Sequence, residues 1–134
     1  MICYESVFGK FVTDYIRKGA MAIFIITNDG WWKSTNGYKQ HLSFASLRAI
    51  ETRRPVARAA NTGISCIIDF RGNRIKETEW WKQTVIKGEI FPETRITPYV
   101  KYGDYLLRIS SLISVSILLV VFIAIPFRKK SKTI

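Results

Sequence analysis

Residues 22–30 read AIFIITNDG, and this stretch decides the fold class of the chain. Its first six residues are almost entirely apolar, which is typical of a β-strand buried on both faces, because a half-exposed strand alternates apolar with polar residues. The Asn-Asp-Gly that follows is a turn signal and ends the strand. Such a strand needs covering layers, so we expect helices in the flanking sequence.

The segments on either side of this strand have the period of amphipathic helices. Apolar residues recur at helical spacing over residues 6–18, and Gly19 suits the C-terminal cap. Residues 41–52 repeat the pattern. We therefore predict one helix before the central strand and one after it.

Shorter apolar runs predict the rest of the sheet. The predicted strand segments are residues 1–4, 55–60, 64–69 and 83–90, with a hairpin-like turn at 69–73 and a linker at 92–104. This order of strands and helices indicates a layered α/β architecture, in which helices pack on a mostly buried sheet.

A long apolar segment near the C-terminus predicts one transmembrane helix within residues 105–127. Residues 109–127 are nineteen residues without a charge, and at a rise of 1.5 Å each they span about 28 Å, close to the roughly 30 Å of a hydrocarbon core. The alternative is a buried core helix, but such helices usually keep a polar stripe.

The basic tail at residues 128–134 predicts the orientation of that helix. Positive residues beside a span stay in the cytoplasm, so we expect a cytoplasmic C-terminus and residues 1–104 on the periplasmic side of a bacterial inner membrane. The formal net charge of +11 suits anionic partners. Beside an apolar span we expect these to be lipid head groups rather than nucleic acid, for which the sequence has no binding motif.

The two cysteines and the single histidine limit the chemistry of the chain. Cys3 and Cys66 are too few for a disulfide scaffold and have no metal-ligand spacing, and His41 lacks the partners of a zinc site. We predict neither a metal nor a cofactor.

Ile-Cys-Tyr-Glu at residues 2–5 resembles the nucleophile segment of the nitrilase, or carbon-nitrogen hydrolase, superfamily. The segments that follow resemble, in the same order, those of one branch, the apolipoprotein N-acyltransferases. They are TNDGWW at 27–32, QH at 40–41, RAIE at 48–51, RP at 54–55, RA at 58–59, NTG at 61–63, TPY at 97–99 and GD at 103–104. The Thr-Pro-Tyr segment and the final span distinguish this branch from soluble amidases.

The resemblance implies both a fold and a reaction. The fold would be the C-terminal half of an αββα sandwich, followed by one transmembrane helix. The reaction would move an acyl chain from a phospholipid donor to a cysteine, as a thioester. The acyl chain would then pass to the α-amino group of a lipoprotein's N-terminal diacylglyceryl-cysteine.

The resemblance makes Cys3 the nucleophile and Glu5 a supporting residue that orients groups of the site. A thiolate attacks esters readily and its thioester stays reactive toward an amine, and a helix that begins beside the cysteine favours the thiolate. From the residues alone, a small buried hydrophobe at a strand end is the favoured interpretation of Cys3, and a helix-start charge is enough to explain Glu5.

Tyr4, Trp31, Trp32 and Asn61 are carried over from the resemblance as substrate-binding residues. The two tryptophans would border the acyl path and suit a membrane interface, although core packing is an equal alternative, and the family usually has Phe at the position of Trp32. We expect Asn61 and Gly63 to form a tight turn near the pocket, with a positive φ at Gly63.

His41 and Cys66 receive structural interpretations. A Cys-His dyad is rejected, because the resemblance requires no histidine at this position and a histidine at a helix start is more often structural. Cys66 lies in a predicted strand and is interpreted as an inert buried thiol.

The superfamily's Glu-Lys-Cys triad has its glutamate base and its lysine upstream of the cysteine, and no residue of this sequence matches them. We expect the chain to be a piece of a longer enzyme, inactive until an upstream N-terminal half completes it. A half-sandwich would also expose a broad apolar sheet face. The alternatives are a catalytically silent membrane-anchored module that assembles with a partner chain, and a truncated nitrilase-type amidase.

Overall fold

In the computed structural model the backbone is described for residues 1–130 and the side chains for residues 1–123. Contacts divide the chain into two compact units, Met1–Gly103 and Asp104–Ile134. The first unit holds the sheet and the packed helices, and the second is built on one long helix.

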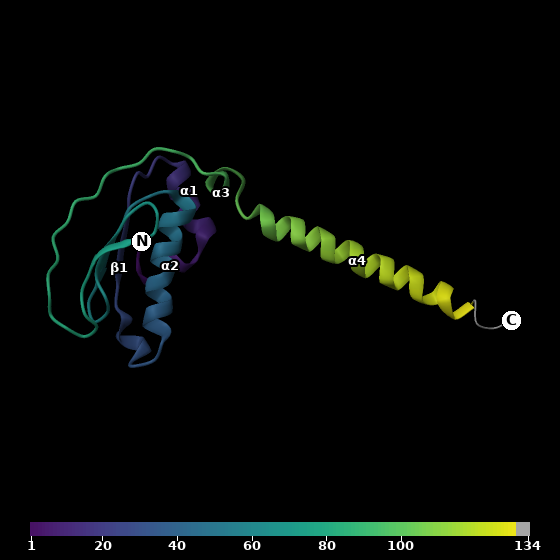
Figure 1. The fold of residues 1–134 in the computed structure, drawn as a ribbon, viewed down its shortest axis with the longest axis horizontal. Helices are drawn as coiled ribbons and strands as arrows, with labels where there is room; N and C mark the ends of the chain where they lie inside the picture. Colours follow the sequence, from purple (N-terminus) through teal and green to yellow (C-terminus); the bar gives the residue numbers. More distant parts are fainter. Residues whose placement is uncertain (131–134) are drawn as a thin grey trace. The chain divides into compact units, whose positions relative to one another are not determined.

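A four-stranded mixed sheet lies at the centre of the first unit (Figure 1). Its strands, in spatial order, are β1 (Ile23–Thr27), β2 (Val56–Ala60), β3 (Cys66–Ile68) and β4 (Arg74–Glu77). The first pair is parallel and the other two are antiparallel. On the free side of β1, Ile2 forms a parallel bridge with Ile26, so the chain start lies beside this edge strand.

The helices are η1 (Cys3–Val7), α1 (Gly9–Arg17), η2 (Asp29–Trp32), α2 (Gly37–Thr52) and α3 (Pro98–Tyr102). Two parallel strands need a crossover, and α2 supplies the one between β1 and β2. The helix predicted at 6–18 is divided at Phe8, whose extended backbone separates η1 from α1. With these corrections, the predicted α/β fold is confirmed.

One buried apolar cluster joins the helices to a single face of the sheet. Each fully buried Ile or Leu side chain contributes about 1.5–3 kcal/mol, so this cluster is the main source of stability. Its members are Val12, Ile16, Ile23, Ile25, Leu42, Ala45, Ala49, Val56, Cys66, Ile68 and Val100.

The prediction that the strand at residues 22–27 is buried on both faces is wrong. Burial alternates along β1, and Phe24 and Ile26 are 62% and 66% exposed on the face opposite the helices. That face also carries Ala57, Ala59 and Ile67, and residues 84–90 pass over part of it around a hollow of about 690 Å³. A continuous apolar run indicates that both faces of a strand can be buried, but it does not say which element covers each face.

The strand predicted at 83–90 and the linker predicted at 92–104 are also wrong. Among the described residues, 83–90 have no strand partner, and Val85 is 94% exposed. The Lys76 side chain donates from Nζ to the Lys87 carbonyl at 2.8 Å, so the segment passes beside β4 without pairing with it. Farther along, Thr97 donates to the Glu51 carbonyl and caps α3, whose Val100 is fully buried. The segment before Gly103 is therefore part of the packed domain.

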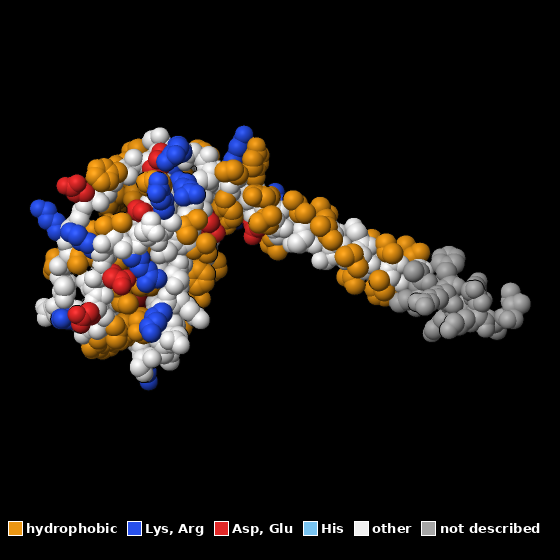
Figure 2. Space-filling view, viewed as in Figure 1, with side chains coloured by type: hydrophobic (Ala, Val, Ile, Leu, Met, Phe, Trp, Pro, Cys, Tyr) orange, Lys and Arg blue, Asp and Glu red, His pale blue; other side chains and the backbone are white. Residues whose placement is uncertain are grey.

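The second unit is the helix α4 (Tyr105–Lys130). Its stretch Tyr105–Ile123 has a mean hydropathy of 2.5 and is long enough to cross a membrane, and none of it is buried within the chain. Figure 2 shows the hydrophobic side chains that gather on its visible face. The side chains of residues 124–130, which include the end of the predicted span and the start of the predicted tail, and the whole of residues 131–134 lie outside the described structure.

Candidate active site

The predicted nucleophile, Cys3, stands at the carboxyl end of β1 in a left-handed backbone conformation. Its φ of 47° is uncommon for a residue with a side chain, and such residues persist where the surroundings impose them, often at active sites. The side chain is half-buried. Thr27, the last residue of β1, donates its hydroxyl hydrogen to Cys3 Sγ over 3.5 Å.

Glu5 fixes the turn that presents the thiol. Its Oε2 accepts the Ile2 N–H at 2.7 Å, while the Glu5 N–H donates to the Ile2 carbonyl at 3.2 Å, so the two residues on either side of Cys3 are tied to each other. The carboxylate thus acts on the backbone of the turn. Tyr4 is 50% exposed, and its ring lies 5.9 Å from those of Phe8 and His41.

A buried polar cluster lies directly behind this turn and consists of Asp29, His41 and Arg58. Asp29 Oδ1 is 2.9 Å from His41 Nδ1, and Asp29 Oδ2 accepts from Arg58 at 2.6 Å. All three residues are at most 3% exposed. Burial raises the pKa of the Asp29 carboxyl, but hydrogen bonds to His41 and Arg58 outweigh it, and the pKa lies below its ordinary value. Asp29 is therefore a carboxylate held by two partners.

The cluster reaches the cysteine through its backbone. His41 Nε2 is 3.3 Å from the Cys3 carbonyl oxygen, which also accepts the Ser6 hydroxyl at 3.0 Å. The Thr27 hydroxyl, which contacts Cys3 Sγ, lies 3.1 Å from Asp29 Oδ1 as well. Because the His41 contact is with the carbonyl oxygen, the rejection of a Cys-His dyad is consistent with this geometry.

Sequence reasoning missed Asp29 and Arg58 as parts of the site, and it misjudged Gly63. Asp29 was read as a turn residue, yet it is fully buried, and Arg58 is a buried charge inside a strand. An arginine at an inward position of a strand was the available signal, since buried charges need partners. Gly63 does not have a positive φ; a Cβ there would collide with the Asp29 carboxylate, so glycine is needed for close approach.

The predicted substrate-binding residues follow β1 and β2 at the same edge as Cys3. Trp31 is 83% exposed, whereas Trp32 is half-buried with its ring against Gly37. Asn61 is exposed, and its N–H donates to the Thr27 carbonyl at 2.9 Å. Thr27 therefore joins the turn of Cys3 to the loop of Asn61.

A second aromatic group at this edge was not predicted. Tyr38 stacks on Trp80 with ring centroids 3.8 Å apart, and Trp80 lies 5.7 Å from the Trp81 ring. The Trp81 N–H donates to the Thr62 carbonyl at 3.3 Å, which fastens this group to the loop that follows β2. Aromatic side chains therefore lie at the loop that follows β2 as well as on the segment that follows β1.

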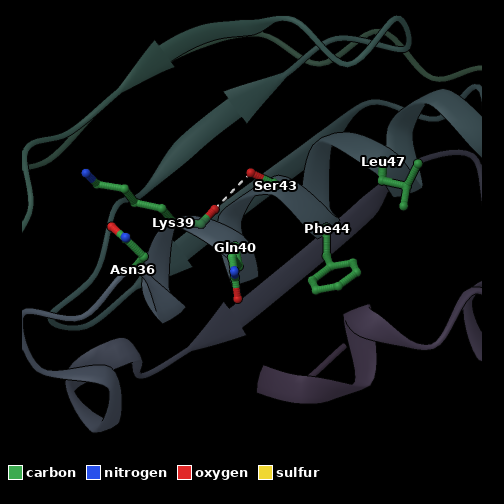
Figure 3. Close-up of a pocket in the computed structure, with 6 residues that line it drawn as sticks. All are labelled: Asn36, Lys39, Gln40, Ser43, Phe44 and Leu47. Carbon is green, nitrogen blue, oxygen red and sulfur yellow. Dashed lines mark hydrogen bonds between the residues drawn. The ribbon is translucent and has the colours of Figure 1, made fainter.

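Two surface hollows lie near the helix α2 and near the start of the chain. One hollow of about 530 Å³ runs along the outer side of α2, and Figure 3 shows Lys39, Gln40, Phe44 and Leu47 along it. Another, of about 420 Å³, is lined in part by Ile2 and Glu5, the neighbours of Cys3. Cys3 lines neither of these two hollows. Among the described residues, no three His, Cys, Asp or Glu side chains gather as a metal site.

The other cysteine has the opposite environment. Cys66 in β3 is 1% exposed and belongs to the apolar cluster. Burial raises the pKa of its thiol to about 11. The interpretation of Cys66 as an inert buried thiol agrees with this position.

Comparison with known proteins places the chain among relatives of known type. It is 42% identical over 104 residues to the apolipoprotein N-acyltransferase of Chlorobaculum tepidum, and 38% identical over 104 residues to that of Geobacter metallireducens. Each alignment covers 78% of this chain and 20% of the relative, so the chain spans about a fifth of their length.

A solved structure and a family profile complete the comparison. The crystal structure of Saccharomyces cerevisiae Nit3, a member of branch 10 of the nitrilase superfamily, aligns with a TM-score of 0.47 at 21% identity, over 61% of this chain and 33% of that chain. Residues 1–99, about three quarters of the chain, match the carbon-nitrogen hydrolase family. The chain belongs to the carbon-nitrogen hydrolase family, and it is similar in sequence to the acyltransferases of that family.

Proposed function

We propose that this chain is the nucleophile-bearing part of an apolipoprotein N-acyltransferase, with Cys3 as the residue that carries the acyl group. The observation that carries the proposal is the Cys3 turn: a half-exposed thiol, in a left-handed conformation, at the carboxyl end of β1. The similarity to curated N-acyltransferases supports the choice of reaction.

The proposed reaction has two acyl-transfer steps. The Cys3 thiolate attacks an ester carbonyl of a phospholipid, a C–S bond forms, the C–O bond breaks, and the lysophospholipid leaves with a proton. The α-amino group of a lipoprotein's diacylglyceryl-cysteine then attacks the thioester. A C–N bond forms, the C–S bond breaks, and the amine proton is released as the thiolate returns. No cofactor is needed, since both steps exchange one acyl bond for another.

Other residues at this edge of the sheet would position the thiol and bind the substrates. Glu5 holds the turn through the Ile2 N–H, and Thr27 contacts the sulfur. Tyr4, Trp31, Trp32 and Asn61 would line the substrate path. The exposed ring of Trp31 would suit the lipid side of that path, because tryptophan favours the boundary between hydrocarbon and water.

We further propose that α4 anchors the chain in the bacterial inner membrane. The 19 uncharged residues at its centre support a span, and the basic residues 128–134 support a cytoplasmic C-terminus with residues 1–104 in the periplasm. Lipid is then available as donor on the side of the membrane where the thiol lies.

Turnover would need an upstream N-terminal half that supplies a glutamate base and a lysine. The sheet face that carries Phe24 and Ile26 is the place on this chain that such a half would cover, since two large apolar side chains are exposed there. This assembly is proposed from the family resemblance and the exposed face together.

The test is transfer of a labelled acyl chain to Cys3. The full chain is co-expressed in a bacterial membrane with the upstream half of a related N-acyltransferase, in cells fed an isotopically labelled fatty acid. Peptide mass spectrometry should find the acyl mass on Cys3, and neutral hydroxylamine should remove it, as expected of a thioester. Cys3→Ala should abolish the label, and Cys66→Ala should keep it.

Two results would contradict the proposal. Absence of acyl-Cys3 when the two halves co-purify would favour a silent membrane-anchored module. Release of ammonia from small amides, without acyl transfer to an amine, would favour a nitrilase-type amidase.

A further inference from the structure

The cluster of Asp29, His41 and Arg58 is unusual because charged groups are buried beside the apolar core. Removing ions from water is costly, and apolar residues of the same volume are often at least as stabilising. Two carboxylate oxygens, a guanidinium and an imidazole nevertheless meet here within 2.6–2.9 Å. A contribution to stability alone therefore does not explain why these charged groups are buried here. The atoms that the cluster contacts indicate its role.

Those contacts end at the backbone of the nucleophile. The Cys3 carbonyl oxygen lies 3.3 Å from His41 Nε2 and 3.0 Å from Ser6 Oγ. The other nitrogen of the same ring, Nδ1, faces the Asp29 carboxylate at 2.9 Å. The imidazole is thus fixed at one side by a buried carboxylate, which Arg58 holds in turn, and it meets the carbonyl oxygen of Cys3 at the other side.

The conformation of Cys3 requires such support. A φ of 47° is unfavourable for a residue with a side chain, so contacts that hold the neighbouring peptide groups stabilise it. The peptide group after Cys3 carries the carbonyl oxygen, so the hydrogen bonds to that oxygen hold this peptide plane and restrict the backbone rotation of Cys3.

We propose that His41 is a positioning residue for the nucleophile: with a hydrogen on each ring nitrogen, it donates through Nδ1 to the Asp29 carboxylate, which Arg58 holds, and through Nε2 to the Cys3 carbonyl oxygen, and so keeps the thiol in its left-handed presentation. This inference rests on the proposed function, in which Cys3 receives the acyl group. His41 acts through the backbone, and neither donates to nor accepts from the sulfur in this role.

Two conservative variants distinguish the hydrogen bond at Nε2 from the hydrogen bond at Nδ1. The amide nitrogen of glutamine can occupy the place of Nε2, so His41→Gln should retain the hydrogen bond to Cys3. The amide of asparagine can occupy the place of Nδ1, so His41→Asn should retain the contact with Asp29 and lose the one to Cys3. Both variants remove the ring, and a purely packing role would be disturbed equally by the two.

The measurement is NMR of the full chain in detergent micelles, labelled with ¹⁵N and ¹³C at cysteine only. Two amide signals result, from Cys3 and Cys66. A positive φ brings the amide hydrogen close to its own Hα, so Cys3 should show a strong intraresidue NOE and Cys66 a weak one. We expect His41→Asn to weaken the Cys3 NOE to the level of Cys66, and His41→Gln to keep it.

Thr52→Val is the matched control. Thr52 is equally buried on α2, and its hydroxyl donates to the Arg48 carbonyl, away from the cluster. This variant should lower the thermal midpoint and leave the Cys3 NOE unchanged. An unchanged NOE in His41→Asn, or equal loss in His41→Asn and His41→Gln, would overturn the proposal.

Should His41→Asn fail to fold, Asp29→Asn decides the question. It keeps the volume at residue 29 and removes the charge that fixes the imidazole, so we expect a weakened Cys3 NOE. A full-strength NOE in folded Asp29→Asn would contradict the proposal.

The acyl-transfer assay gives a second, independent result. In the completed enzyme, misplacement of the sulfur by about 1 Å can lower the rate by about a hundredfold, so His41→Asn should form acyl-Cys3 far more slowly than His41→Gln. If the unaltered chain forms no acyl-Cys3 but shows the expected NOE pattern, the proposed function fails and the positioning role of His41 stands.

Discussion

The turn that carries Cys3 and the strand that carries Cys66 hold the same side chain in opposite settings. Cys3 is half-buried in a left-handed turn and touches the Thr27 hydroxyl, whereas Cys66 is 1% exposed in a regular strand among apolar residues. Burial raises the pKa of the Cys66 thiol to about 11, which keeps it protonated at neutral pH. Backbone geometry and neighbours, rather than residue type, decide which thiol is available for chemistry.

Arg58 connects the two regions. It lies opposite Cys66 in the register of β2 and β3, and its guanidinium reaches forward to Asp29 behind the Cys3 turn. Both residues of this pair point to the helix side of the sheet. A change at Arg58 should therefore disturb the strand and the turn together, and it carries the largest effect expected here.

Arg58→Met should lower the free energy of unfolding by about 3 kcal/mol, because it leaves the buried Asp29 carboxylate without its cationic partner. The measurement is urea denaturation in detergent, followed by tryptophan fluorescence. Arg71→Met is the control: Arg71 is exposed, so its loss should change the unfolding free energy by no more than about 0.5 kcal/mol. Equal effects of the two substitutions would show that the buried pair does not link the two regions.

The next effect concerns the chemical contrast between the thiols. The pKa of Cys66 lies about two units above its ordinary value of 9.0, so at pH 8 its thiolate fraction is about a hundredfold smaller than in the unfolded chain. Iodoacetamide followed by peptide mass spectrometry should label Cys3 in the folded chain and leave Cys66 unlabelled, and labelling of Cys66 should rise as the pH approaches 11.

Urea supplies the control for this contrast, since both cysteines should react once the chain is unfolded. Rapid labelling of Cys66 in the folded chain at pH 8 would mean that β3 opens readily, and the distinction between the two settings would be lost.

Local patterns predicted the parts of both regions that depend on neighbours in the chain. The apolar run at β1, the strand of Cys66 and the amphipathic α2 followed from periodicity, because each element buries residues at its own repeat. The motif around Cys3 came from resemblance. Its left-handed φ had no signal of its own, since the contacts that impose it come from residues 27 and 41, far along the chain.

Long-range features account for what the sequence did not predict. The sequence predicts Asp29 as a turn residue, because aspartate is common both in turns and in buried ion pairs. The two cases differ only in the partner, and the fold alone brings Arg58 to Asp29. Residues 83–90 have strand-like composition, yet in the described structure they do not pair with the outer edge of β4 and pass over one face of the sheet instead. The exposed Phe24 and Ile26 belong to an apolar run whose second face is not covered by the helices.

The smallest expected effect concerns the Cys3 turn alone and tests whether this turn is independent of the strand that carries Cys66. Glu5→Ala removes the acceptor of the Ile2 N–H and should lower the free energy of unfolding by about 1 kcal/mol, the usual value of such a local cap. Glu5→Gln keeps an oxygen at the same place and should cost less. Both should leave the slow labelling of Cys66 unchanged while the intraresidue NOE of Cys3 weakens in the alanine variant, because the turn and the strand depend on different contacts. Faster labelling of Cys66 in the Glu5→Ala variant would instead show that the turn and β3 unfold as one cooperative unit.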